Sequence, residues 1–180
     1  MKKKRIPIFS LAVYERIRET IGKLPPESGG LICGNPKTNC VTYYYFDDKA
    51  ECSSVVYIPD TITLIPLLKK LNDEGLEMMG FPHSHPSGCD CPSTGDKFYA
   101  SKIFEANPDM RQLIIPIIES AASGQPFQMR VFIATPRRGE VEIKRVPLHV
   151  CEIEMSLPEV APPPAEDAKI IIPNLTKYLI

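Results

Sequence analysis

The first apolar pattern along the chain has a period of about four residues. Charged residues stand between the apolar positions, which are Phe9, Val13, Ile17 and Ile21. This spacing puts the apolar side chains on one face of a helix, so it predicts an amphipathic helix over residues 9–21. Ser10 is expected to cap the start of this helix, and Gly22 is expected to end it.

Two further stretches show helical patterns. Residues 63–74 carry closely spaced leucines and isoleucines, with Pro66 expected in the first turn and Gly75 at the end. Residues 93–107 begin with Ser93, a residue type that is favoured as an N-cap.

Strand patterns fill most of the remaining chain. Short runs rich in β-branched and aromatic residues, bounded by turn formers, predict strands over residues 29–34, 40–46, 53–58, 77–81, 112–118, 127–134 and 141–148. Pro116 interrupts one run, which predicts that this strand lies near an edge or carries a bulge. Strands with helices beside them indicate an α/β domain.

The composition changes after residue 156. Residues 157–169 hold four of the nineteen prolines and are typical of a stiff linker, and residues 170–180 are strongly apolar. We therefore divide the chain into a domain at 1–156 and a C-terminal segment at 157–180. The apolar end has two open interpretations, either a strap that returns to the domain surface or a docking segment for a partner.

Charge and hydropathy exclude several classes of function. The 21 basic and 22 acidic residues nearly balance, so the total charge favours neither nucleic acid nor an anionic membrane as a partner. No apolar run approaches the ~20 residues of a membrane-spanning helix, and the short apolar stretch after residues 2–5 lacks a signal-peptide cleavage site. We expect a cytoplasmic protein whose six scattered cysteines are free thiols.

Metal-ligating residue types cluster in "HSHPSGCDCPSTGD", residues 83–96. If the first residues are extended, His83 and His85 point to the same side, and both imidazoles can face one ion. Asp96 would lie in the first turn of the next helix, which the intervening turn formers can fold back over the strand end. Two imidazoles and one carboxylate, with water as the fourth ligand, make a candidate zinc site.

Each of these residues also has a simpler explanation when it is taken alone. A single His-x-His pair is a weak metal signal. Ser93 and Asp96 fit a capping box at a helix start, and an acidic residue in a first helical turn is favourable in any case. Glu27 follows two prolines, and the simplest interpretation of this residue alone is a solvent-exposed side chain.

Taken together, residues 83–96 fit the pattern His-x-His-Pro-x6-Ser-x2-Asp without a gap. This resembles the signature of the JAMM (MPN-plus) metalloprotease family. The upstream segment "PPESGGLICG" supplies Glu27 in the Glu-x-Gly-Gly context that this family uses. The resemblance covers about residues 9–150 and is closest to the small prokaryotic type. It implies a cytidine-deaminase-like fold, with a curved mixed β-sheet flanked by helices.

The resemblance also implies a role for each site residue. His83, His85 and Asp96 would bind one catalytic Zn²⁺. Glu27 would take a proton from the zinc-bound water as general base and pass it to the leaving amine. Ser93 would donate a hydrogen bond to the oxyanion of the tetrahedral intermediate.

The family further implies hydrolysis of the amide bond after the C-terminus of a ubiquitin-like protein, in deconjugation or in precursor processing. Partners would be that protein or its conjugates and, in a bacterial anti-phage operon, the activating and conjugating enzymes encoded beside it. Two alternatives stay open. One is a processing peptidase for a sulfur-carrier protein, and the other is a catalytically silent scaffold.

Two cysteines inside the motif have more than one interpretation. Cys89 and Cys91 lie between His85 and Ser93 in the predicted loop. They are either free thiols in a turn or redox-sensitive groups whose thiolates reach the metal. Replacement of Asp96 by a cysteine ligand, as in zinc deaminases, is disfavoured because no Cys-x-x-Cys pair is present.

Overall fold

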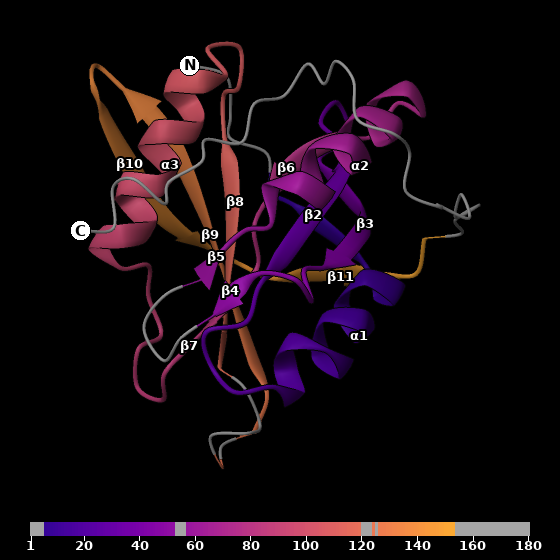
Figure 1. Ribbon diagram of the computed structural model, residues 1–180, viewed down its shortest axis with the longest axis vertical. Coiled ribbons are helices and arrows are strands. Elements are labelled where there is room, and N and C mark those ends of the chain that lie inside the picture. Colours follow the sequence, from indigo (N-terminus) through magenta and orange to yellow (C-terminus); the bar gives the residue numbers. More distant parts are fainter. Residues whose placement is uncertain (1–5, 53–56, 120–123, 125, 154–180) are drawn as a thin grey trace.

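The protein is described here by a computed structural model, which places residues 6–52, 57–119, 124 and 126–153. These residues form one curled sheet, a small two-stranded ribbon and helices on both sheet faces (Figure 1). The predicted boundary at residue 156, and with it the segment 157–180, lies outside the described residues. Within them, no helix is both long enough and apolar enough to cross a membrane.

The helices are α1 (Leu11–Glu19), the 3-10 helix η1 (Ile21–Lys23), α2 (Thr61–Asp73) and α3 (Thr94–Ala106). The strands are β1 (Ile8–Ser10), β2 (Gly30–Asn35), β3 (Cys40–Phe46), β4 (Glu51–Cys52), β5 (Tyr57–Ile58), β6 (Glu77–Gly80), β7 (His83–His85), β8 (Leu113–Glu119), β9 (Gln128–Arg137), β10 (Glu140–Val146) and β11 (His149–Cys151).

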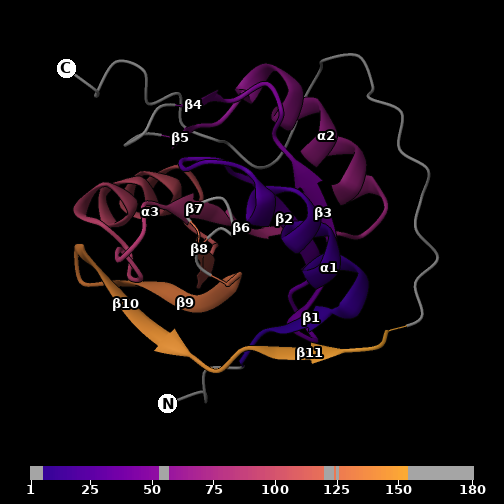
Figure 2. The same cartoon turned by 90° about the horizontal axis from the view of Figure 1, so that it is seen from below.

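The main sheet is mixed. Its order is β10-β9-β8-β6-β2-β3-β1-β11, and β7 pairs with β8 beyond the end of β6. Strands β6 and β7 run parallel to β8, whereas β2 and β9 run antiparallel to their neighbours. Viewed from below, the sheet curls strongly from β10 round to β11 (Figure 2). The prediction of a curved mixed sheet flanked by helices is therefore confirmed.

Both faces of the central strands are buried. Leu31 of β2 packs with residues of α2 and α3, while its neighbour Ile32 packs with residues of α1. Along β8, Ile115 and Ile117 face the first cluster, and Ile114 faces the second. Because side chains alternate along a strand, a strand covered on both sides must be apolar at every position.

The start of the first predicted helix is wrong by two residues. Phe9 lies in β1, where it pairs with Val41 of β3, and its side chain is fully buried. Ser10 is the N-cap, as predicted, because its hydroxyl accepts a hydrogen bond from the Val13 amide at 3.2 Å. Phe9 matches the four-residue period, but pairing in the sheet determines its backbone conformation.

Both proline predictions are also wrong. Helix α2 begins at Thr61, after the Asp60 N-cap, so Pro66 lies beyond its first turn. Pro66 leaves the carbonyl of Ile62 without its helical donor, and Ile62 is 85% exposed, so water can reach that end of the helix. Pro116 lies in an unbulged interior strand, level with the break between β6 and β7. The missing N–H is tolerated there because the neighbouring strand is interrupted.

Candidate metal centre

Strand β7 holds the two motif histidines on one side. His83 and His85 are 6% and 5% exposed, and their Nε2 atoms lie 3.0 Å apart. The segment is extended because it pairs in parallel with β8, with His83 opposite Ile117 and His85 opposite Glu119. The predicted convergence of the two imidazoles is therefore present in the structure.

Backbone carbonyls fix which nitrogen of each ring carries the proton. Nδ1 of His83 lies 3.3 Å from the carbonyl oxygen of Phe81, and Nδ1 of His85 lies 3.2 Å from that of Cys89. A carbonyl can only accept, so each Nδ1 donates. In the neutral rings, both Nε2 lone pairs then point into the same small space. Metal-binding histidines characteristically show this arrangement.

The Asp96 carboxylate lies beside the two imidazole nitrogens, so three potential metal ligands converge. From the first turn of α3, its Oδ1 lies 2.9 Å from Nε2 of His83, and its Oδ2 lies 3.4 Å from Nε2 of His85. Burial raises the pKa of the Asp96 carboxyl, but the two imidazoles and the Ser93 amide outweigh this effect and hold the pKa well below its usual range. Asp96 is therefore a carboxylate near neutral pH, as a metal ligand requires.

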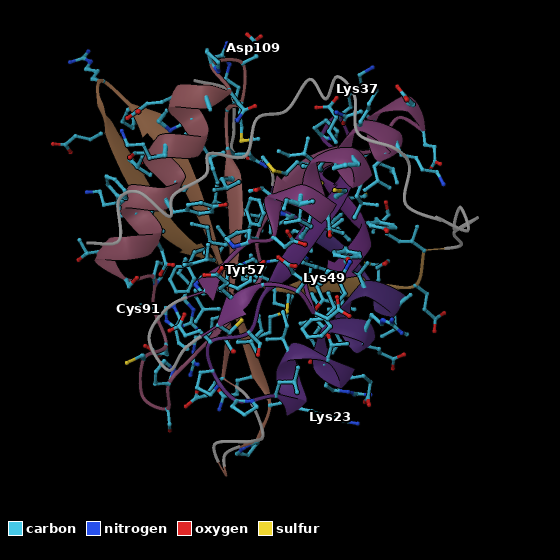
Figure 3. The ribbon with its side chains drawn as sticks, viewed as in Figure 1. Lys23, Lys37, Lys49, Tyr57, Cys91 and Asp109 are labelled. Carbon is cyan, nitrogen blue, oxygen red and sulfur yellow. The ribbon has the colours of Figure 1, made fainter. Side chains whose placement is uncertain are left out.

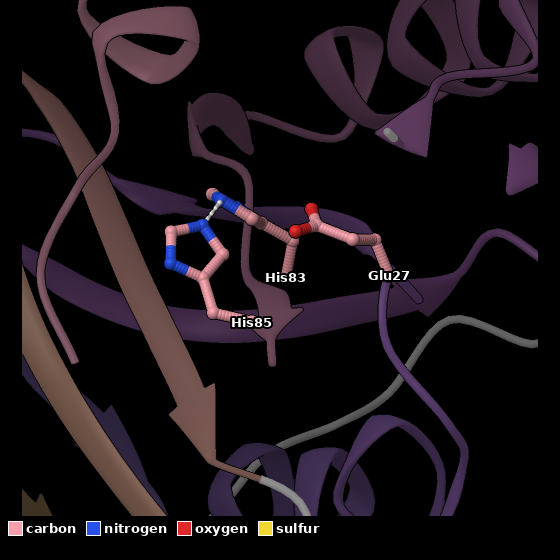
Figure 4. A group of neighbouring side chains, drawn as sticks. All are labelled: Glu27, His83 and His85. Atoms are coloured by element: carbon pink, nitrogen blue, oxygen red, sulfur yellow. Dashed lines mark hydrogen bonds between the residues drawn. The ribbon is translucent and has the colours of Figure 1, made fainter. Parts of the chain in front are cut away.

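Glu27 reaches the same place from a distant part of the chain. One ligand atom each from Glu27, His83 and His85 lies within 4.8 Å of the others. Figure 4 shows the Glu27 carboxylate directed toward the His83 ring. Burial raises the pKa of Glu27, although both imidazoles act in the opposite direction. A raised pKa suits a group that must both accept and release a proton.

Two serines join the Glu27 segment to β7. The Ser28 amide donates to Ser84 Oγ at 2.9 Å, and the Ser84 amide donates to the Ser28 carbonyl at 2.8 Å. Ser84 is the residue between the histidines, and its side chain points away from them. The same alternation that turns His83 and His85 toward an ion therefore leaves Ser84 free to hold the Glu27 segment.

Tyr57 and Asp47 support the site, and sequence reasoning missed both. The Tyr57 ring stacks on His83 with centroids 6.4 Å apart, and its hydroxyl donates to Asp47 Oδ2 at 3.0 Å. Asp47 Oδ2 also accepts from the Asp60 amide at 2.9 Å, which ties the ring to the start of α2. Figure 3 shows Tyr57 near the middle of the molecule. No local pattern in the sequence marks these contacts.

Gly29 is required by the Tyr57 ring. A Cβ atom at Gly29 would lie 2.4–2.6 Å from three ring carbons. We expect Gly29→Ala to destabilise the fold by about 1–3 kcal/mol because the ring or the Glu27 segment must shift, as measured by chemical denaturation. The double variant with Tyr57→Leu should recover most of this loss. A loss that is the same with and without the ring would refute the steric cause.

Ser93 lies in a capping box with Asp96. Its hydroxyl donates to Asp96 Oδ2 at 2.8 Å and accepts from the Asp96 amide at 3.1 Å, while the Ser93 amide also donates to that Oδ2. The simpler interpretation of the pair is therefore correct as far as the helix start is concerned. It is also compatible with metal binding, because the box leaves Oδ1 directed at His83.

Removal of the Ser93 hydroxyl separates its two roles. We expect Ser93→Ala to lower the free energy of unfolding by about 1 kcal/mol through the lost cap. If the hydroxyl also stabilises the reacting carbonyl oxygen, kcat falls by about 10²–10³-fold. Ser101→Ala on the same helix is the matched control. Full activity in a destabilised Ser93→Ala protein would leave Ser93 as a helix cap alone.

The candidate metal-ligand group found among the described residues includes neither of the two motif cysteines. Cys89 and Cys91 are exposed in the loop before α3, and Cys89 contributes its carbonyl oxygen, as described above. Figure 3 shows the Cys91 side chain pointing outward from this loop. All six cysteines are free thiols. The redox interpretation of this pair stays a prediction.

The donor set fits a divalent cation such as Zn²⁺. Two neutral imidazoles and one carboxylate are a common set of zinc ligands, and the carboxylate can come from Asp96 or Glu27. The fold and site thus define a mixed α/β domain with a candidate metal centre where β7 meets the start of α3.

Comparisons with known proteins agree with this description. The family profile for prokaryotic homologs of the JAB domain matches residues 11–132. The chain therefore belongs to the prokaryotic JAB family, which confirms the family predicted from the motif. No curated protein sequence gives a significant match.

Two solved structures are similar to this chain. The solution structure of a protein from Desulfitobacterium hafniense has a TM-score of 0.62 and 22% identity, and the match covers 82% of this chain and 94% of that one. It supports the fold alone. The crystal structure of a JAB1/MPN domain protein from Archaeoglobus fulgidus has a TM-score of 0.39 and 20% identity, with 81% and 98% covered.

Proposed function

We propose that the protein is a zinc-dependent hydrolase that cleaves the amide bond after the C-terminus of a ubiquitin-like protein. The observation that carries this proposal is the convergence of the bare Nε2 atoms of His83 and His85 with the Asp96 carboxylate, beside a second carboxylate on Glu27. A purely structural ion pair has no need of the second carboxylate.

The chain's own residues supply the other parts of the reaction. His83, His85 and Asp96 would hold Zn²⁺, which when bound acts as a Lewis acid and lowers the pKa of a coordinated water to about 7. Glu27 accepts a proton from the attacking water and returns it to the leaving amine. Ser93 is exposed at the start of α3, and its hydroxyl, which donates to Asp96 Oδ2 in this structure, would have to turn from that bond to donate its proton to the carbonyl oxygen.

The neighbouring ribbon offers a place for an extended substrate tail. Tyr57 of β5 contacts His83, so the β4–β5 ribbon borders the site. Within the described residues β4 pairs only with β5, which leaves its other edge open. An extended C-terminal tail can add a strand to such an edge through main-chain hydrogen bonds. This supports a polypeptide tail as the substrate.

The wider setting is part of the proposal. The natural substrate would be a ubiquitin-like protein or its conjugates in the cytoplasm, with activating and conjugating enzymes from the same bacterial operon as partners. A sulfur-carrier precursor is the second candidate, because its processing uses the same amide hydrolysis. Neither nucleic acid nor a membrane is needed for this function.

Cleavage of defined fusions tests the proposal. The zinc-loaded protein is incubated with ubiquitin-like and sulfur-carrier proteins, each joined at its C-terminus to a reporter, and the products are identified by mass spectrometry. We expect a cut directly after the last residue of at least one tail. Stoichiometric zinc with no cleavage of any fusion would instead favour a silent scaffold.

A further inference from the structure

The loop between β7 and α3 fixes the orientation of one metal ligand. This loop, residues 86–92, forms a turn in which the Cys89 amide donates to the Pro86 carbonyl at 3.0 Å. The Cys89 carbonyl in turn accepts from Nδ1 of His85 at 3.2 Å. Ring orientation and tautomer at His85 therefore depend on where this largely exposed loop lies.

One arginine ties the loop to the sheet. Arg130 of β9 contacts two carboxylates at once: its Nε lies 3.3 Å from Asp90 Oδ2, and its Nη1 lies 3.1 Å from Glu119 Oε2. Asp90 follows Cys89 directly in the loop. Glu119 stands opposite His85 in the β7–β8 register. The guanidinium thus connects the loop to the strand position beside the ligand that the loop orients.

This pair of contacts differs from an ordinary surface ion pair. The Arg130 and Glu119 side chains are 18% and 15% exposed, whereas Asp90 is 50% exposed. A guanidinium can serve two carboxylates in fixed geometry because its donors form a rigid fork, which a lysine lacks. Arg137, on the same strand, pairs with Glu142 at an exposed position remote from the loop.

We propose that Arg130 is a positioning residue for the metal centre, acting through Asp90 and the Cys89 carbonyl to hold His85 in its ligating tautomer. The inference rests on the proposed function, since it presumes that His85 binds the ion. Some residues outside the coordination sphere hydrogen-bond to the metal ligands. Mutation of such residues commonly lowers metal affinity by about 10–100-fold. Arg130 is placed one contact further out, so its effect should lie near the lower end of that range.

Zinc affinity in matched variants tests the proposal. Dissociation constants are measured by competition with a chromophoric chelator, and the visible spectrum of the cobalt-substituted protein reports ligand geometry. Arg130→Met should weaken zinc binding by about tenfold, and Asp90→Asn by a few-fold, because the half-exposed loop contact is the weaker one. Asp90→Glu should restore part of the affinity, and Arg137→Met should leave it unchanged.

The outcomes separate this inference from the proposed function. Arg130→Met strands Glu119 and is expected to lower the melting temperature of the metal-free protein, so Asp90→Asn serves as the variant with an intact fold. If wild type binds zinc and both variants bind it equally well with unchanged cobalt spectra, the positioning role is wrong. If wild type itself binds no zinc, the proposed function fails instead.

Discussion

Replacing Glu27 with glutamine is expected to lower kcat/KM by about 10²–10⁴-fold, because the amide cannot accept the proton of the attacking water. Zinc affinity should remain close to that of wild type, since His83, His85 and Asp96 are left intact. Cleavage of the best fusion substrate is measured beside zinc content for both proteins. Glu15→Gln, at an exposed position on α1, is the matched control and should retain full activity.

The same variant decides which carboxylate binds the metal. Glu27 lies close enough to both histidines to be a ligand itself. If Glu27→Gln loses zinc while Asp96→Asn keeps it, the proposed roles of the two carboxylates are exchanged. If Glu27→Gln keeps zinc and full activity, the general-base mechanism is wrong.

Metal-free and zinc-loaded protein are expected to respond to pH in opposite directions. Burial lowers the pKa of His83, but the carboxylates of Asp96 and Glu27 outweigh it, so the net pKa is raised. A raised pKa stabilises the metal-free fold fully below about pH 6.5, and this stabilisation is lost as the pH rises through the folded-state pKa. The lowered pKa of Asp96 adds stability that is lost only below about pH 4.

Above about pH 6.5, bound zinc reverses the pH dependence of stability, so that the zinc-loaded fold becomes more stable as the pH rises. The reason is that zinc binds the neutral imidazoles and competes with their protonation. Zinc at about 100 times its dissociation constant adds about 2.7 kcal/mol, which raises the melting temperature of a chain of this length by about 5–10 °C. At a fixed free zinc concentration, the increment should grow between pH 6 and pH 8, because the apparent dissociation constant falls as the imidazoles lose their protons. An increment that shrinks over this range would contradict coordination by neutral histidines, and Asp96→Asn should show little increment at any pH.

Local patterns predicted the elements that carry the candidate metal centre. Strict alternation placed His83 and His85 on one side of a strand, and the Ser93 cap placed Asp96 in a first helical turn. These features depend only on residues near each other in the chain. Pairing in the sheet was less visible: Phe9 fits a helical period but belongs to β1, and β11, which follows the predicted strand over residues 141–148, was missed because only its pairing with β1 marks it.

The residues that support the site could not be found by such patterns. Glu27 is brought to His83 through hydrogen bonds between Ser28 and Ser84, which are 56 positions apart. Tyr57 and Arg130 act through tertiary contacts with partners on other strands and loops. The family motif identified Glu27 by analogy, but it gave no information about Tyr57 or Arg130, whose roles depend on the packing of this particular chain.

The sequence offered helix capping and metal ligation as competing explanations for Asp96, and in the structure the position of its carboxylate is compatible with both. Its Oδ2 accepts from the Ser93 amide and hydroxyl, while its Oδ1 faces His83. A helix start specified by these residues therefore preorganises the carboxylate before any ion arrives.

This sharing of one carboxylate constrains how the domain can evolve. A descendant that drifts toward a non-catalytic adaptor cannot discard Asp96 without also weakening the first turn of α3, unless another side chain takes over the reciprocal bond to residue 93. Glutamate or glutamine at position 96 would serve that purpose. Loss of the proposed hydrolase activity would therefore begin more readily at Glu27, where no helix depends on the side chain.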